Sequence, residues 1–222
     1  MGGLVEQAST YAAAVDAMFM TVLILTGIAF VLVEFILLYF LIRYRHREGR
    51  KAKYIHGNRR VEFVWTLVPG LMLFGLAVYQ YDAWINIKID LPSASESLTI
   101  SLSANQFEWE AIYPGEDGVL DTADDIKAPI NVLHFPVNQP VIVELESVDV
   151  LHSFFIPELR IKQDAVPGML IPVWFEATKT GNFEIACAEL CGLGHYRMRG
   201  LVTVESESDF NAWLADVQER QS

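Results

Sequence analysis

The feature that most constrains this chain is a long apolar run near its N-terminus. From Ala17 to Ile42 the only charged residue is Glu34, and nearly every other side chain is apolar, Gly or Thr. As a helix these 26 residues would extend about 39 Å, which is enough to cross a bilayer with some tilt. A buried core helix is the alternative reading, but the length of the run argues against it. Glu34 lies within the span, so we expect it to face a protein partner rather than lipid.

A second apolar run makes a membrane hairpin the favoured interpretation. Phe63 to Tyr81 carries no charge over 19 residues, and Trp84 lies just beyond it. We expect two spans, at about 17–42 and 63–84. The first run is too long for the apolar region of a cleavable signal peptide, and no basic segment precedes it.

Charge predicts the orientation of this hairpin. The connecting segment 43–60 holds eight of the sixteen Lys and Arg residues and a single acid, Glu48. Short basic loops stay on the cytoplasmic side, so we expect both termini outside a bacterial-type inner or plasma membrane. The domains would then be a transmembrane hairpin, 1–87, and an extracytoplasmic domain, 88–222. The latter has 8 basic and 22 acidic residues, 8 − 22 = −14, which disfavours nucleic acid and favours a basic partner.

The extracytoplasmic part has the pattern of a β domain. Seven short runs separated by turn signals predict strands at 98–104, 107–113, 140–147, 150–156, 171–177, 182–188 and 200–206. This spacing is typical of a β-sandwich or barrel with little helix. One short helix is expected at the end of the chain, where Phe210, Trp213, Leu214 and Val217 share a face and Ser206 or Ser208 can cap it.

One loop of this domain, 113–129, is unusually acidic. It contains Glu116, Asp117, Asp121, Asp124 and Asp125. A solvated turn is one interpretation and an extra cation held by the carboxylates is another, although the spacing differs from the helix-flanked calcium loop. A docking surface for a basic partner is the third.

The two cysteines lie together in "CAELCGLGHYRM", residues 187–198. Outside the cytoplasm two cysteines usually form a disulfide. A closed zinc site would need paired Cys and His motifs, which the chain lacks. Cys191, His195 and Met198 instead have the order of ligands in a blue-copper loop, and His152 in an upstream strand offers the second imidazole. Cys187 could add a second thiolate and so bridge two copper ions.

With these motifs in place, the chain resembles subunit II of the haem–copper cytochrome c oxidases. The resemblance rests on the hairpin, "VEFVWTLVP", "NQFEW", "DVLHSFFIPELRIKQDAVPG" and the cysteine loop. It implies an all-β, cupredoxin-like sandwich with a binuclear copper centre, CuA. It also implies an electron-accepting role beside subunit I and the other oxidase subunits, in contact with membrane lipids. The implied copper ligands are His152, Cys187, the carbonyl of Glu189, Cys191, His195 and Met198, and the Glu189 side chain would reach a magnesium ion shared with subunit I.

The resemblance also suggests roles for residues outside the copper loop. Glu62 would mark the entrance of a proton pathway, although a Glu at a helix N-terminus is favourable by itself. Phe107 stands where the family usually has Trp, the residue at which the electron enters, and Trp109 follows two positions on. Asp149 is a candidate docking acid for cytochrome c or another basic or haem donor. The substitution at Phe107 suggests a different donor or docking pose, and Met169 replaces the family's Arg in "PGR".

Three competing interpretations use parts of the same pattern. A quinol-oxidase subunit II shares the fold but lacks the copper ligands. A nitrous-oxide-reductase-type protein carries the same centre on a large soluble enzyme. A membrane-anchored copper-delivery or disulfide protein would need the two cysteines without His152 or Met198.

Overall fold

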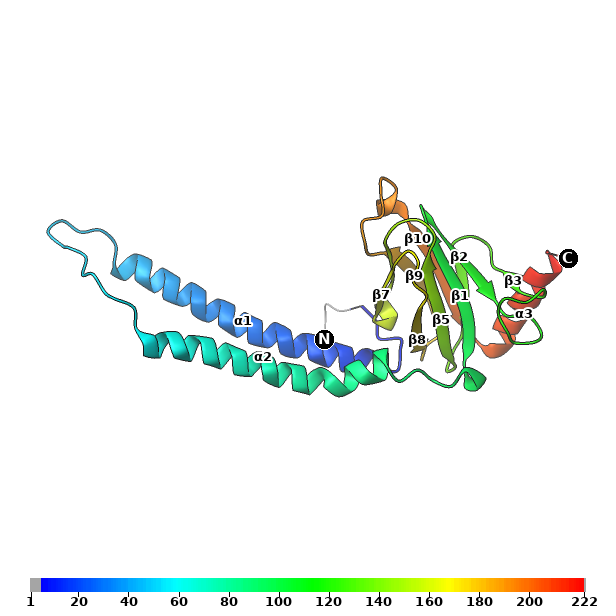
Figure 1. Ribbon diagram of the computed structural model, residues 1–222, viewed down its shortest axis with the longest axis horizontal. Helices are drawn as coiled ribbons and strands as arrows, with labels where there is room; N and C mark the ends of the chain where they lie inside the picture. The colour runs from blue at the N-terminus through cyan, green and yellow to red at the C-terminus, as the bar shows by residue number, and fades with distance from the viewer. Residues whose placement is uncertain (1–4, 222) are drawn as a thin grey trace. The chain divides into compact units, whose positions relative to one another are not determined.

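A computed structural model describes residues 5–221, which form two units (Figure 1). One unit comprises residues 14–84 and is helical. The other is rich in β-structure and contains the described residues before Ala14 together with those from Ile85 onward. The expected combination of a helical hairpin, a β domain and a short terminal helix is therefore confirmed.

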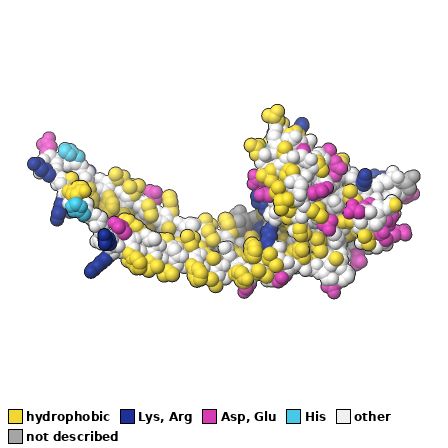
Figure 2. All heavy atoms as spheres, in the orientation of Figure 1, with side chains coloured by type: hydrophobic (Ala, Val, Ile, Leu, Met, Phe, Trp, Pro, Cys, Tyr) yellow, Lys and Arg dark blue, Asp and Glu magenta, His cyan; other side chains and the backbone are white. Residues whose placement is uncertain are grey.

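The helical unit is built from α1 (Ala12–Arg43) and α2 (Arg59–Lys88). Their most apolar windows have mean hydropathies of 2.6 and 1.9, and 0% of either window is buried within the chain. Figure 2 shows apolar side chains along these helices, with Lys and Arg gathered at the connecting loop. A core helix would be covered by its own chain, so these two helices are membrane spans rather than core helices.

The β-rich unit is a sandwich of two five-stranded sheets. The first has the order β3-β2-β1-β5-β8 and the second the order β4-β10-β9-β6-β7. Between them lies one apolar core, centred on large buried side chains such as Trp109, Phe135 and Phe175. The strands are β1 (Leu98–Asn105), β2 (Glu108–Tyr113), β3 (Ile126–Lys127), β4 (Val132–Pro136), β5 (Pro140–Ser147), β6 (His152–Ile156), β7 (Ile161–Ala165), β8 (Ile171–Glu176), β9 (Gly181–Cys187) and β10 (Arg199–Glu205).

All seven predicted strands are present, and three further strands were missed. The missed ones, β3, β4 and β7, are each an edge of a sheet. An edge strand pairs on one side only and can be short or polar, so its alternation is weak. In β7, for example, only Ile161 and Ala165 of the five residues are buried.

The C-terminal helix α3 (Glu207–Glu219) closes the end of the sandwich. Ser206 is its N-cap, because the hydroxyl accepts a hydrogen bond from the Asp209 N–H at 3.2 Å. Phe210 and Val217 are buried, and the Trp213 ring stacks on His134 of β4 with centroids 4.0 Å apart. This side of the helix therefore extends the core.

The segment before α1 packs on the sandwich. Ala8 and Ala12 are fully buried, and Ser9 forms an isolated β-bridge with Ala177. The Ser9 hydroxyl also donates to the carbonyl of Leu159 at 2.7 Å. These contacts make the first described residues part of the β-rich unit, although they precede the first helix in the chain.

Candidate metal centre

Three strands of the second sheet bring potential ligands to one end of the sandwich. His152 begins β6, Cys187 ends β9, and Met198 directly precedes β10. Because β6 and β9 are antiparallel, with Phe154 opposite Cys187, the start of one strand meets the end of the other. The N–H of Cys187 donates to the carbonyl of Met198 at 3.1 Å, so the loop of residues 187–198, which is called the copper loop after its predicted ligands, leaves and rejoins the sheet at the same place.

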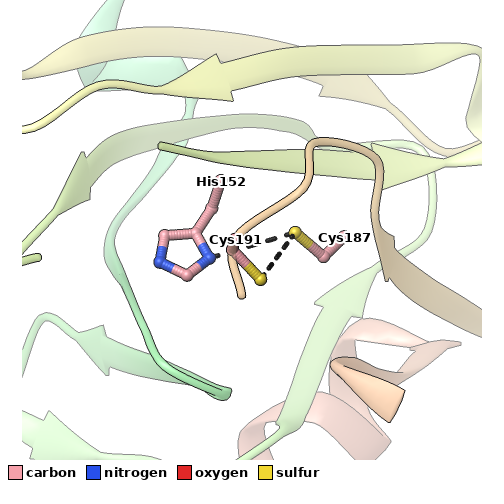
Figure 3. Close-up of side chains that lie close together, drawn as sticks. All are labelled: His152, Cys187 and Cys191. Atoms are coloured by element: carbon pink, nitrogen blue, oxygen red, sulfur yellow. Dashed lines mark hydrogen bonds between the residues drawn. The ribbon is translucent and has the colours of Figure 1, made fainter. Parts of the chain in front are cut away.

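His152, Cys187 and Cys191 form a group that could hold a metal ion. Their ligand atoms all lie within 4.8 Å of one another, and Figure 3 shows the imidazole and both sulfurs side by side. The two Sγ atoms are 3.8 Å apart, and Nδ1 of His152 is 3.9 Å from Sγ of Cys187. Two ligands held about 2.3 Å from a tetrahedral metal are themselves about 3.8 Å apart. The spacing therefore fits ligands that share a metal.

The same spacing excludes a disulfide in this structure. A disulfide bond is about 2.05 Å long, whereas these sulfurs are 3.8 Å apart and both cysteines are free.

Three further predicted ligands surround the two sulfurs. His195 Nδ1 lies 3.7 Å from Sγ of Cys191. The Met198 sulfur lies 3.7 Å from the same Sγ and 3.2 Å from His152 Nδ1. The Glu189 carbonyl oxygen lies 3.2 Å from Sγ of Cys187. Together with His152 of β6, the loop thus gathers two thiols, two imidazoles, one thioether and one carbonyl, and the thiols, thioether and imidazoles are donors that suit copper.

Most of these donors are shielded from water. His152 is fully buried, and Cys187, Cys191 and Met198 are exposed by only 8%, 3% and 2%. Burial, reinforced by the adjacent Cys187 thiol, raises the pKa of the Cys191 thiol to about 11. Two neighbouring thiolates are therefore unfavourable here unless positive charge lies between them, which is what bound metal ions supply.

Asp149 contacts the imidazole of His152 at Nε2, whereas Nδ1 is the ring nitrogen near the sulfurs. One oxygen of its carboxylate lies 2.8 Å from His152 Nε2, and the other accepts the N–H of Gln106 at 2.8 Å. Although partial burial raises the pKa of Asp149, hydrogen bonds from His152, Val150 and Gln106 outweigh it and hold the pKa below its usual value. A carboxylate on Nε2 orients the ring so that Nδ1 faces the sulfurs. Asp149 therefore contacts one of the predicted metal ligands, and this contact does not depend on the docking role predicted for it.

Phe107 lies against the copper loop. It is half-buried, and a Cβ built on Gly194 would lie 2.4 Å from its ring. The Arg197 guanidinium stands over the ring, 6.0 Å from its centroid. Phe107 therefore covers the loop where a side chain at position 194 would otherwise sit.

Trp109 lies deeper than Phe107. Its side chain is fully buried, and its ring makes edge contacts with those of His152 and Phe154 at centroid distances of 6.4 and 6.1 Å. An electron from a surface donor could therefore reach Trp109 only through other groups.

The side chain of Glu189 contacts a lysine outside the donor set. Its carboxylate lies 3.5 Å from the Lys162 ammonium on β7 and is 38% exposed. It remains accessible to a group outside this chain.

Glu62 is in the first turn of α2. Its N–H donates to the Asn58 carbonyl at 2.9 Å, and the Asn58 side chain accepts from the N–H groups of Arg60 and Val61. The predicted position at the helix start is therefore present, in the helical unit.

The acidic loop, residues 113–129, lies far from the metal-ligand donors at the end of the second sheet. The acidic loop begins at the C-terminal end of β2, whereas the Gln106–Phe107 turn, which contacts the copper loop, lies at the N-terminal end of that strand. The six residues of β2 span about 20 Å, which separates the acidic loop from the donor set. Within the loop, Asp124 accepts from the Thr122 hydroxyl, Asp125 accepts from the N–H of Asp121, and Asp117 accepts from the N–H of Val119. These three carboxylates bond within the loop, and the fold does not bring them to the donor set.

Sequence reasoning missed one residue that contacts both halves of the site, Gln106. Its side-chain amide donates to the Cys191 carbonyl, and its backbone N–H bonds Asp149. Its position beside Phe107 in "NQFEW" was the one available signal, and that signal does not specify a contact.

Comparison with known proteins agrees with this architecture. A sequence profile described as the periplasmic domain of cytochrome C oxidase subunit II matches residues 98–206, and one for the transmembrane domain of that subunit matches residues 2–82. The crystal structure of the periplasmic domain of subunit II of a Bradyrhizobium japonicum cytochrome oxidase is 29% identical. It covers 60% of this chain and 100% of its own, with a TM-score of 0.51.

Two relatives bear on the type of oxidase. The alternative cytochrome c oxidase subunit 2 of Bradyrhizobium diazoefficiens is 35% identical over 211 residues, which are 86% of this chain and 75% of the relative. Quinol oxidase subunit 2 of Bacillus subtilis is 30% identical over 203 residues, 88% of this chain and 59% of that relative.

Proposed function

The chain belongs to the cytochrome c oxidase subunit II family, and on that basis we propose that it holds two copper ions and passes electrons to subunit I. The single observation that carries the proposal is the convergence of six donors from His152, Cys187, Glu189, Cys191, His195 and Met198. Thiols, a thioether and imidazoles are donors that copper prefers, and the 3.8 Å between the two sulfurs fits ligands that share a metal.

Each group of residues has a distinct role in this proposal. Cys187 and Cys191 would bridge the two ions. His152 with Met198 would complete one ion, which the 3.2 Å between Nδ1 of His152 and the Met198 sulfur supports, and His195 with the Glu189 carbonyl would complete the other. Such a pair, when bound, supplies a one-electron relay in which charge is shared and little rearrangement accompanies transfer. Burial of the donors excludes water, and Asp149 fixes the His152 ring.

For the donor, we propose a carrier that approaches at Phe107. This ring is the half-buried aromatic group that covers the copper loop, and it bears the Arg197 cation rather than an acid. A cytochrome c or another haem carrier remains the proposed class. At about 20 Å the acids of the 113–129 loop are more than two Debye lengths away at physiological salt. They would therefore act through screened long-range attraction.

Orientation and proton uptake complete the proposal. The basic connection 43–60 would lie in the cytoplasm, with the domain 88–222 outside and the hairpin in 1–87. Glu62 at the start of α2 would then stand on the side from which protons are taken up. The exposed carboxylate of Glu189 would be free to reach a magnesium ion shared with subunit I, in exchange for its contact with Lys162.

A quinol oxidase subunit is the second candidate, because the Bacillus subtilis relative is 30% identical over 88% of this chain. Copper analysis with EPR on the purified oxidase decides between the two. Two copper ions per chain sharing one unpaired electron give a seven-line hyperfine pattern, which is the expected result. A four-line pattern would remove Cys187 from the assignment, and a copper-free chain would favour the quinol oxidase.

A further inference from the structure

Gln106 links two segments that the two sheets hold separately. It lies in the turn between β1 and β2, in the first sheet, whereas the donors lie at the end of the second. Its side-chain Nε2 donates to the Cys191 carbonyl at 2.5 Å, and its backbone N–H donates to Asp149 Oδ2 at 2.8 Å. Asp149 Oδ1 in turn lies 2.8 Å from His152 Nε2.

The copper loop is shaped to receive this contact. Gly192, next to Cys191, has φ of +134°, a conformation that side chains disfavour. A Cβ there would lie 2.7 Å from Gln106 Nε2 and 3.2 Å from the Phe107 ring. Glycine therefore lets the turn approach the loop backbone closely enough for the hydrogen bond.

Besides the packing of Phe107, the middle of the loop has few hydrogen bonds to the rest of the domain. Leu190, Leu193 and Tyr196 are 81%, 96% and 85% exposed, and the N–H groups of His195 and Arg197 bond carbonyls within the loop itself. At its start, Ala188 bonds the Ser153 carbonyl, and at its end Cys187 and Met198 bond each other. The hydrogen bond from Gln106 thus ties the exposed middle of the loop to the opposite sheet.

From these contacts we propose that Gln106 is a positioning residue for both halves of the donor set. Its amide fixes Cys191 and its backbone N–H fixes Asp149, which holds His152. The positive end of the amide dipole also faces the loop beside Cys191 and favours the reduced, more electron-rich state of whatever metal Cys191 binds. The second part of this proposal rests on the copper-binding function proposed above, whereas the first concerns the loop itself.

Two variants separate the side chain of Gln106 from its backbone. Gln106→Leu removes the donor at similar size, and Gln106→Glu places an acceptor against the Cys191 carbonyl. Both keep the backbone N–H to Asp149. Asn105→Leu is the matched control, because Asn105 lies one residue earlier and its amide bonds Glu110 at 2.9 Å, away from the loop.

The first measurement uses the full-length chain freed of metal, with alkylation of Cys187 and Cys191 as the readout. Both sulfurs are almost fully buried, so reagents reach them when the loop opens. Loss of one hydrogen bond should raise the alkylation rate about fivefold in Gln106→Leu, and more in Gln106→Glu. Asn105→Leu should react at the rate of the unmodified chain.

The second measurement uses the copper-loaded oxidase and its reduction potential. The potential should fall by about 40 mV in Gln106→Leu, the one-electron equivalent of a fivefold change. It should fall further in Gln106→Glu, with two copper ions retained. Alkylation rates and potentials equal to those of Asn105→Leu would overturn the proposal and leave the copper assignment intact. A copper-free unmodified chain would instead end the copper assignment, while the alkylation series would still decide whether Gln106 holds the loop.

Discussion

The two units of this protein differ in how much each one completes by itself. In the helical unit the apolar windows of the spans are not buried within the chain, and among the described residues, 5–221, the Glu34 side chain forms no hydrogen bond or ion pair. In the β-rich unit, His152, Cys191 and Asp149 each contact partners contributed by the same chain. The lesson is that one chain can assemble the donor set, whereas the apolar surface of the hairpin is left uncovered by this chain.

The strongest test of this difference removes one of the two sulfurs that are proposed to bridge the copper ions. Cys187→Ser keeps the size of the side chain but replaces the thiolate with a poor copper ligand. Electron uptake should fall by more than about 100-fold, since even changes behind the ligands cost about 10–100-fold. Stopped-flow reduction checks this, with EPR on the same samples. Met198→Leu is the comparator, because loss of a weak ligand should shift the potential and preserve the seven-line signal. Unchanged electron uptake in Cys187→Ser would show that Cys187 is not a required ligand of the electron-accepting site.

A smaller effect is expected from crowding the contact between Phe107 and the loop. In Gly194→Ala the new Cβ would lie 2.4 Å from the Phe107 ring, so one of the two must move. We expect a loss of about 1–3 kcal/mol in the free energy of unfolding of the β-rich unit. When Phe107 is already replaced by Ala, adding Gly194→Ala should cost less stability than it does in the unmodified chain. Additive effects in a denaturant-unfolding cycle would mean that the ring does not pack against position 194 in solution.

The N-terminal segment offers a test of where the self-sufficient unit ends. Ser9→Ala removes the buried hydrogen bond to the Leu159 carbonyl, which should destabilise the β-rich unit by about 1 kcal/mol. Ser95→Ala is the matched control, because Ser95 is exposed and bonds Ser93. Equal unfolding midpoints for the two variants would assign the segment to the hairpin alone.

The smallest effect is expected in the membrane, at Glu34. If a neighbouring subunit supplies its partner, Glu34→Leu should weaken the association of this chain with the oxidase by about 0.6 kcal/mol, a typical value for such contacts. Glu34→Gln should retain more of it. Retention of the chain during graded detergent treatment measures this. A complex that is more stable with Leu would show that Glu34 faces lipid, and the contrast between the two units would be weaker than stated.

The parts of the structure that the sequence predicted share a physical cause. The spans, the six inner strands and the ligand spacing are local patterns set by hydropathy, alternation or ligand order. Three of the four edge strands were missed, because a strand such as β4 finds its partner, β10, more than sixty residues away. Gln106 was missed for a related reason, since its role depends on a turn of one sheet meeting a loop of the other. The docking role of the 113–129 acids remains a prediction, although the fold places them away from the donors.

The six residues of β2 separate a turn that contacts the candidate metal centre from a loop that does not. The turn before the strand contacts Cys191 through the Gln106 side chain and Asp149 through the Gln106 backbone N–H, so a change of side chain there acts on the loop that carries the ligands. The loop after it bonds mainly within itself. Insertions, deletions or charge changes in that loop can accumulate without altering the ligand geometry. The surface charge of this loop can therefore change without altering the contacts at the proposed metal site.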